Sequence, residues 1–181
     1  NGYFGTDGTW APSGLESRYG VTKTGFGYNW HVADVRFDLA VNRNEVNRFG
    51  WVVEIDPHDP EATPAKRTAL GRFKHEGAEC IVNPDGRLVL YSGDDQRFEF
   101  LYKFVTEGRV DMRNRAANRD LLDAGTLYVA RFDADGTLNW LPLVHGQGAL
   151  TADNGFDSQA DVVIGARRAA TLNPIEALRY E

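Results

Sequence analysis

The feature that most constrains the fold is a pair of tight turns, each beside strand-like runs. The first turn is Asn83-Pro84-Asp85-Gly86, which has proline at the second position of a β-turn, glycine at the fourth, and an apolar run at 87–92 after it. The second turn, 133–136, joins similar runs at 126–132 and 137–143. Because the turn glycines Gly86 and Gly136 are 50 residues apart, we predict a repeated antiparallel unit, as in four-stranded β-propeller blades.

The rest of the chain agrees with an all-β class. Aromatic residues make up 12% of the chain, which also has 19 glycines and 7 prolines, a composition typical of strands with frequent turns. We expect a partial β-propeller, a few blades of antiparallel strands with long loops. Further strands are predicted at 50–56, 67–73, 79–82 and 98–105.

Three segments of the chain differ in residue composition and in their pattern of apolar residues. We predict a loop-rich insertion at 1–48, propeller blades at 49–165, and a divergent C-terminal tail at 166–181 with a helix at 175–179. The chain opens with Asn-Gly-Tyr-Phe, without an initiator methionine or a signal-like segment. We therefore expect an internal section of a longer protein.

Charge and cysteine content narrow the function classes. The net charge of −6 lacks the basic footprint of a nucleic-acid-binding protein and suits cations better than polyanions. The single cysteine, Cys80, excludes an intramolecular disulfide, and its apolar setting predicts a core thiol. No apolar run approaches the roughly 20 residues of a membrane span.

The densest polar cluster is the segment 74–79, Lys-His-Glu-Gly-Ala-Glu, which we expect to form a loop between two strands. Glu76 and Glu79 offer oxygen ligands for hard cations, and Lys74 offers a point charge for a phosphate. His75 is a candidate for metal ligation or proton transfer. The competing interpretation is a solvated loop without a function.

A second acidic cluster follows the next strand. Asp94 and Asp95 are candidates for binding a divalent cation, and the alternative is that they only cap a turn. The acidic segments 133–136 and 56–59 lack the pattern of a calcium loop, so we interpret both as turns. Nucleophile-elbow, P-loop and dinucleotide-binding motifs are absent from the sequence.

Several long runs carry a family resemblance. The sequence is similar to the PhoX family of bacterial alkaline phosphatases across residues 1–170, and after Thr171 it departs from the family pattern. The runs that match are NRFGWVVEIDP at 47–57, KRTALGRFKHEGA at 66–78, YSGDDQRFE at 91–99, YKFV at 102–105 and GTLYVARF at 125–132.

This resemblance implies a β-propeller phosphomonoesterase with a cluster of Ca²⁺ and Fe³⁺. It implies export in folded form by the twin-arginine machinery, and so a periplasmic or secreted protein whose substrate is a small phosphomonoester. By resemblance, Glu76 is a metal ligand and Lys74 holds the substrate phosphate, which makes both catalytic candidates. Glu79, Asp94 and Asp95 follow as further Ca²⁺ ligands.

Two other functions remain open on the sequence. One is a non-catalytic β-propeller binding module that has lost the metal cluster. The other is a calcium-dependent lactonase or esterase on the same scaffold. The sequence does not give the complete ligand set, the organic part of the substrate or the oligomeric state.

Overall fold

The computed structural model describes residues 2–172, so the helix predicted at 175–179 lies outside the described residues. The chain divides into two units, Asn1–Gly50 and Trp51–Glu181, each with its own internal contacts. Among the described residues, no helix has the length and hydropathy needed to cross a membrane.

The first unit is built from short helices and loops. Helix α1, Gly14–Arg18, begins at a capping box in which Ser13 and Glu16 each bind the backbone N–H of the other. Helix α2 is Trp30–Ala33. The core of this first unit is a cluster of buried side chains around Phe4, which is 1% exposed. The other members are Tyr19, Val21, Leu39 and Val46.

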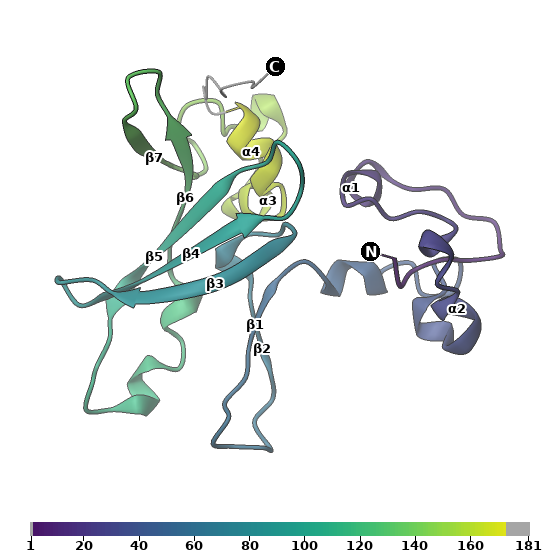
Figure 1. The fold of residues 1–181 in the computed structure, drawn as a ribbon, viewed down its shortest axis with the longest axis horizontal. Coiled ribbons are helices and arrows are strands. Elements are labelled where there is room, and N and C mark those ends of the chain that lie inside the picture. The colour runs from purple at the N-terminus through teal and green to yellow at the C-terminus, as the bar shows by residue number, and fades with distance from the viewer. Residues whose placement is uncertain (1, 173–181) are drawn as a thin grey trace. The chain divides into compact units, whose positions relative to one another are not determined.

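The second unit contains the strands (Figure 1). Strands β1 and β2 pair as an antiparallel hairpin, and β3 to β7 form a five-stranded antiparallel sheet in sequence order. The strands are β1 Val52–Glu54, β2 Ala65–Arg67, β3 His75–Val82, β4 Arg87–Asp94, β5 Leu101–Arg109, β6 Gly125–Phe132 and β7 Leu138–Pro142. The mostly-β class is therefore confirmed.

Several short 3₁₀-helices connect these elements. They are Gly25–Gly27, Val35–Phe37, Glu45–Arg48, Thr68–Leu70, Arg115–Asn118, Leu121–Asp123 and Ala152–Asn154.

Both predicted turns are confirmed. The prediction that their hairpins are copies of a repeated unit is not. The Gly86 N–H donates to the Asn83 carbonyl at 2.8 Å, and the Gly136 N–H donates to the Asp133 carbonyl at 2.9 Å. The two hairpins belong to the same sheet, as β3–β4 and β6–β7, with β5 between them. The prediction that they represent two separate repeats is wrong, since sequence spacing does not report which strands share a sheet.

Three strand boundaries differ from those predicted. The run 67–73 is not a strand, because after β2 it turns through a 3₁₀-helix into Gly71, whose φ is +84°. The cluster 74–79 is not a loop, because β3 begins at His75. Strand β5 begins at Leu101 rather than Phe98, which has a positive φ of 64° and is 89% exposed.

The main core lies on one face of the five-stranded sheet. Leu90, Phe104 and Leu127 lie directly opposite one another on β4, β5 and β6, and each is at most 4% exposed. Helices α3, Gln159–Ile164, and α4, Ala166–Leu172, contribute to the same core. Their small buried side chains allow a close approach to the other core residues: Val162, Ala166, Ala169 and Ala170, all 0% exposed.

A buried arginine links the β1–β2 hairpin to the segment after β5. The Arg67 guanidinium donates to Glu54 at 2.7 Å and to Asp123 at 2.8 Å, and it also binds the Arg119 carbonyl. Only 5% of its side chain is exposed. Three acceptors therefore satisfy a charge that is almost fully removed from water.

Candidate functional site

Four of the five predicted site residues lie at one end of the β3–β4 pair. Glu76 pairs with Gly93, and His75 pairs with Asp94. The Asp95 N–H donates to the carbonyl of Lys74 at 2.8 Å. The antiparallel pairing therefore brings together two clusters that are about 20 residues apart in the sequence.

A β-bulge decides where the two glutamates point. The register shifts between Glu76 and Glu79, so that Glu76 pairs with Gly93 and Glu79 pairs with Tyr91. A Cβ added to Gly93 would lie 3.8 Å from the Cβ of Glu76, as expected for residues on one face. In a regular strand, residues three apart point to opposite faces. The extra residue of the bulge places both carboxylates on the same face, which we call the outer face because the core lies on the other.

Asp94 does not share this face. Asp94 lies opposite His75, whose ring faces the core side, so Asp94 belongs to the face opposite Glu76. Asp95 follows the end of β4. Within the described part of the chain, no three His, Cys, Asp or Glu side chains are grouped to hold a metal ion.

The chemistry of the donors nevertheless suits the expected ions in part. Carboxylate oxygens are preferred ligands of Ca²⁺, which takes six to eight oxygen atoms. Glu76 and Glu79 on one face supply such oxygens, but too few to complete a coordination shell. The described residues, 2–172, therefore supply some of the ligands of a metal centre but not a complete set.

Lys74 is the residue before β3. Its ammonium group donates to the side-chain amide oxygen of Gln96. An amide is a neutral partner, so this hydrogen bond does not neutralise the charge of the ammonium group.

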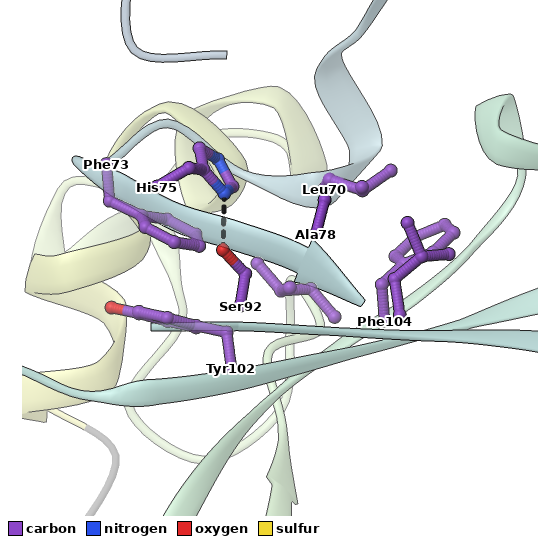
Figure 2. A pocket seen from close by; sticks show the side chains of 9 residues that line it. Leu70, Phe73, His75, Ala78, Ser92, Tyr102 and Phe104 are labelled. Atoms are coloured by element: carbon purple, nitrogen blue, oxygen red, sulfur yellow. Dashed lines mark hydrogen bonds between the residues drawn. The ribbon is translucent and has the colours of Figure 1, made fainter. Parts of the chain in front are cut away.

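The His75 ring is half-buried and is held by packing and hydrogen bonds. Its ring lies 3.7 Å from the ring centre of Phe73, and Nε2 lies 3.0 Å from the Gly71 carbonyl oxygen. Nδ1 lies 2.8 Å from Ser92 Oγ (Figure 2). Burial lowers the pKa of His75, and the bond to Gly71 opposes this shift only in part. Both ring nitrogens have hydrogen-bonding partners within the protein, and the role of His75 in metal ligation or proton transfer remains a prediction.

The histidine lines a small apolar pocket beneath β3. In Figure 2, Phe73, His75 and Tyr102 form a stack on one side of it, with Ala78 and Phe104 further along. The Phe73 and Tyr102 rings are 4.2 Å apart and both side chains are buried. This packing fixes the plane of the imidazole.

Cys80 departs from its prediction as well. It is exposed on β3, a strand at the edge of the sheet. Partial burial raises the pKa of its thiol, and the charges of Glu79 and Glu54 raise it further. A metal-ligating cysteine needs its thiolate form, so this setting argues against such a role.

The comparisons with known proteins agree with the family resemblance described from the sequence. Residues 1–181 match the family model described as alkaline phosphatase PhoX. The chain belongs to this family. A comparison with curated proteins gives no match.

A solved structure gives a similar result. The chain is 52% identical to PhoX of Pseudomonas fluorescens, solved in complex with vanadate, a transition state analogue, with a TM-score of 0.87. The match covers 94% of this chain and 31% of that one. This PhoX-family chain thus spans about a third of the length of its solved relative.

The PhoX-family chain also has site features that residue patterns did not predict. On the outer face, the Lys103 ammonium lies 5.0 Å from the ring centre of Tyr128 and 4.5 Å from that of Trp140. Tyr91 lies opposite Lys103 in the register. The bulge was equally unforeseen, although an isolated glycine within a strand-like run is its usual signal, and Gly77 is such a residue.

Proposed function

We propose that the protein containing this chain hydrolyses phosphomonoesters and that this chain contributes part of its metal and phosphate site. The observation that carries the proposal is the match at 52% identity, over 94% of the chain, to a PhoX solved with a transition state analogue. The location of Lys74 just before β3, and of Glu76 and Glu79 on one face of it, supports it, since an anion and a cation would both find partners there.

We propose separate roles for these residues. Glu76 and Glu79 would hold Ca²⁺ from the outer face, and Asp95, just after the end of β4, would contribute at the edge of the cluster. Fe³⁺ would need additional ligands from the longer protein. When bound, the ions would neutralise the phosphate charge and polarise its oxygens. Lys74 would orient the phosphoryl group and add positive charge where negative charge develops.

The fold and location of the longer protein belong to the same proposal. We propose that the five-stranded sheet is part of a β-propeller and that the protein is exported in folded form by the twin-arginine machinery to the periplasm or medium. Family membership supports both statements. Electron microscopy of the longer protein would test the propeller, and cell fractionation with and without a functional twin-arginine system would test export.

The decisive experiment uses the longest natural polypeptide that contains this chain. We expect Glu76→Gln to remove bound metal and to lower kcat on p-nitrophenyl phosphate by roughly 100-fold, the usual loss when one charge-stabilising group is removed. The matched control is Glu107→Gln, an exposed glutamate on β5, which should keep both metal content and kcat.

Other results would favour the other functions. A protein without calcium or iron by elemental analysis, and without phosphatase activity, would be a binding module. A protein that hydrolyses a lactone but not the phosphate ester would be a lactonase or esterase. If Glu76→Gln kept full metal content and activity, the assignment of Glu76 would be wrong.

A further inference from the structure

The bulge at Gly77 sits on a strand that is poorly restrained by the sheet. Strand β3 is an edge strand and pairs only with β4 in the five-stranded sheet. A bulge interrupts the ladder on the one side where an edge strand has hydrogen bonds. Gly77 also has a φ of +71°. Backbone pairing alone therefore restrains this segment less than the rest of β3.

A side-chain network supplies the missing restraint. Ser92 Oγ on β4 donates to the Gly77 carbonyl at 2.9 Å. The same oxygen lies 2.8 Å from His75 Nδ1, and His75 Nε2 lies 3.0 Å from the Gly71 carbonyl oxygen. The network joins the turn before β3, the first residue of β3, the bulge and β4.

The directions of these hydrogen bonds follow from the groups involved. A carbonyl only accepts, so Nε2 carries the proton toward Gly71. In the neutral ring, Nδ1 is then an acceptor toward Ser92. The serine hydroxyl has one proton for two acceptors, so it donates to the Gly77 carbonyl or to His75 Nδ1 and alternates between them. Ser92 is therefore the central member of the network, and loss of its hydroxyl disconnects the bulge from β4.

Packing holds the network in one arrangement. The His75 ring stacks on Phe73, which stacks on Tyr102, and both aromatic side chains are at most 2% exposed. A side chain fixed in this way positions its hydrogen-bonding atoms more precisely than a solvated one.

We propose that Ser92 and His75 are positioning residues that clamp the Gly77 bulge and thereby hold Glu76 and Glu79 on the same face of β3. Neither residue needs to touch the substrate. The consequence for catalysis rests on the proposed function, whereas the clamp itself is a property of the chain. Without it, the bulge would be free to slip by one residue, which would move one glutamate to the core face.

The test uses three variants in the longest natural polypeptide that contains this chain. Ser92→Ala removes the hydroxyl and Ser92→Thr restores one. Thr106→Val is the matched control, because the Thr106 hydroxyl also joins two backbone groups of the same sheet, the Leu88 N–H at 3.0 Å and the Gly108 carbonyl at 2.8 Å. It does so away from the proposed site.

The rate of amide hydrogen exchange in β3 measures directly how firmly the bulge is held. We expect Ser92→Ala to speed exchange in peptides covering 75–82 by roughly fivefold, the factor for loss of one hydrogen bond, and Ser92→Thr to restore the wild-type rate. Thr106→Val should speed exchange near Leu88 and leave 75–82 unchanged. If Ser92→Ala left exchange in 75–82 at the wild-type rate, the clamp would be overturned.

Metal content and kcat then measure the effect of the clamp on the proposed site. We expect Ser92→Ala to bind less metal and to lower kcat by 10- to 100-fold, roughly the loss typical of residues that orient a metal ligand, with rescue by Ser92→Thr. An equal fall in kcat for Thr106→Val would mean general destabilisation and would overturn the positioning role. Faster exchange in Ser92→Ala, in a protein whose wild type hydrolyses no phosphomonoester, would support the clamp and overturn the proposed function instead.

Discussion

Glu76 and Glu79 share one face of β3 although they are three residues apart in the sequence. The register shift between them is the cause, since Glu76 pairs with Gly93 and Glu79 with Tyr91 across only one intervening residue of β4. A single extra residue thus converts an alternating strand into one that presents two neighbouring carboxylates together.

The conformation of Gly77 makes this bulge sensitive to substitution. We expect stability to fall in the order Gly, Asn, Ala, Val, with about 1–2 kcal/mol lost for Gly77→Ala, because φ is +71° and L side chains disfavour that region. A Cβ at this position meets nothing within 4 Å, so the loss comes from the backbone alone. Urea unfolding measures it. Equal stability of the alanine and glycine forms would contradict this account.

A steric control is available on the same sheet. A Cβ at Gly125 would collide with the Val105 carbonyl oxygen and the Phe104 ring. Gly125→Ala should therefore cost more than Gly77→Ala, although the φ of Gly125 is not positive.

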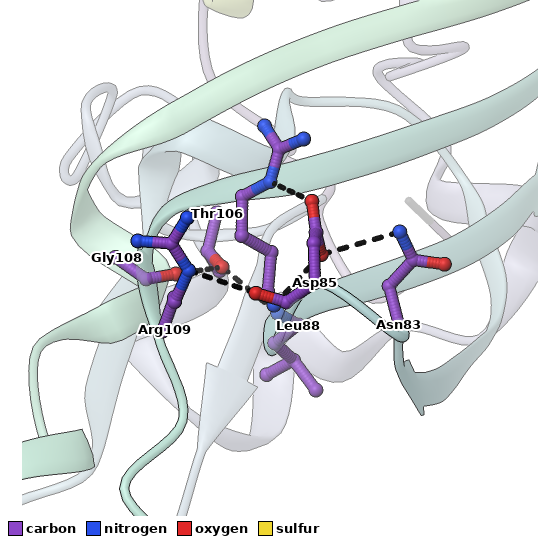
Figure 3. A network of polar contacts seen from close by, with 7 residues as sticks. Asn83, Asp85, Leu88, Thr106, Gly108 and Arg109 are labelled. Atoms are coloured by element: carbon purple, nitrogen blue, oxygen red, sulfur yellow. Dashed lines mark hydrogen bonds and ion pairs between the residues drawn. The ribbon is translucent and has the colours of Figure 1, made fainter.

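The Thr106 hydroxyl joins two backbone groups at the far end of the β4–β5 pair (Figure 3). Thr106 is fully buried, so Thr106→Val leaves the Leu88 N–H without a partner or water. We expect a loss of about 1–3 kcal/mol in the free energy of unfolding, the usual cost of such an unpaired group. Denaturant unfolding measures it, with exposed Thr63→Val as the control. Loss of less than about 0.5 kcal/mol, the range of surface substitutions, would argue against this role.

Arg67 should be difficult to replace even by lysine. Arg67→Met removes the partner of Glu54 and Asp123, whose side chains are 45% and 54% exposed and can be partly hydrated. We therefore expect a loss of about 1–3 kcal/mol, below the range for fully buried pairs. Arg67→Lys should recover only part of it, because an ammonium cannot match the planar arrangement of three acceptors.

A double-mutant cycle tests this interpretation. If the ion pair matters, Arg67→Met and Glu54→Gln together should cost less than the sum of the two single changes. Strict additivity would show that Arg67 acts through packing and not through Glu54.

Lys103 predicts a pH dependence of stability. Burial among Tyr128 and Trp140 lowers the pKa of Lys103 below its usual 10.5. Between the folded and unfolded pKa values the unfolded chain binds more protons, so this residue makes stability rise as pH increases through that window. Lys103→Met keeps the packed stem and removes the titration.

The comparison is best made by urea unfolding at pH 7 and pH 10. Other lysines and tyrosines titrate in both proteins, so the difference between them isolates Lys103. We expect the wild type to gain stability relative to Lys103→Met as the pH rises. The opposite sign would mean that attraction to the aromatic rings outweighs burial and raises the pKa.

The local sequence was sufficient to predict the tight turns of this protein, because a turn depends on the backbone preferences of a few neighbouring residues. The turns at Asn83–Gly86 and Asp133–Gly136 formed as predicted, because glycine in both turns and proline in the first restrict the backbone of the few residues around them. Long runs of sequence also established the family. The roles of Lys74, Glu76, Glu79, Asp94 and Asp95 remain predictions.

Only the tertiary structure decided how the strands pair and what each side chain meets. It placed both hairpins in one sheet, moved Asp94 to the face opposite Glu76, exposed Cys80 at the edge and enclosed His75 against Phe73. The physical reason is that strand register depends on partners far away in the chain. A shift of one residue reverses every side chain between core and solvent, and no short window of sequence contains that information.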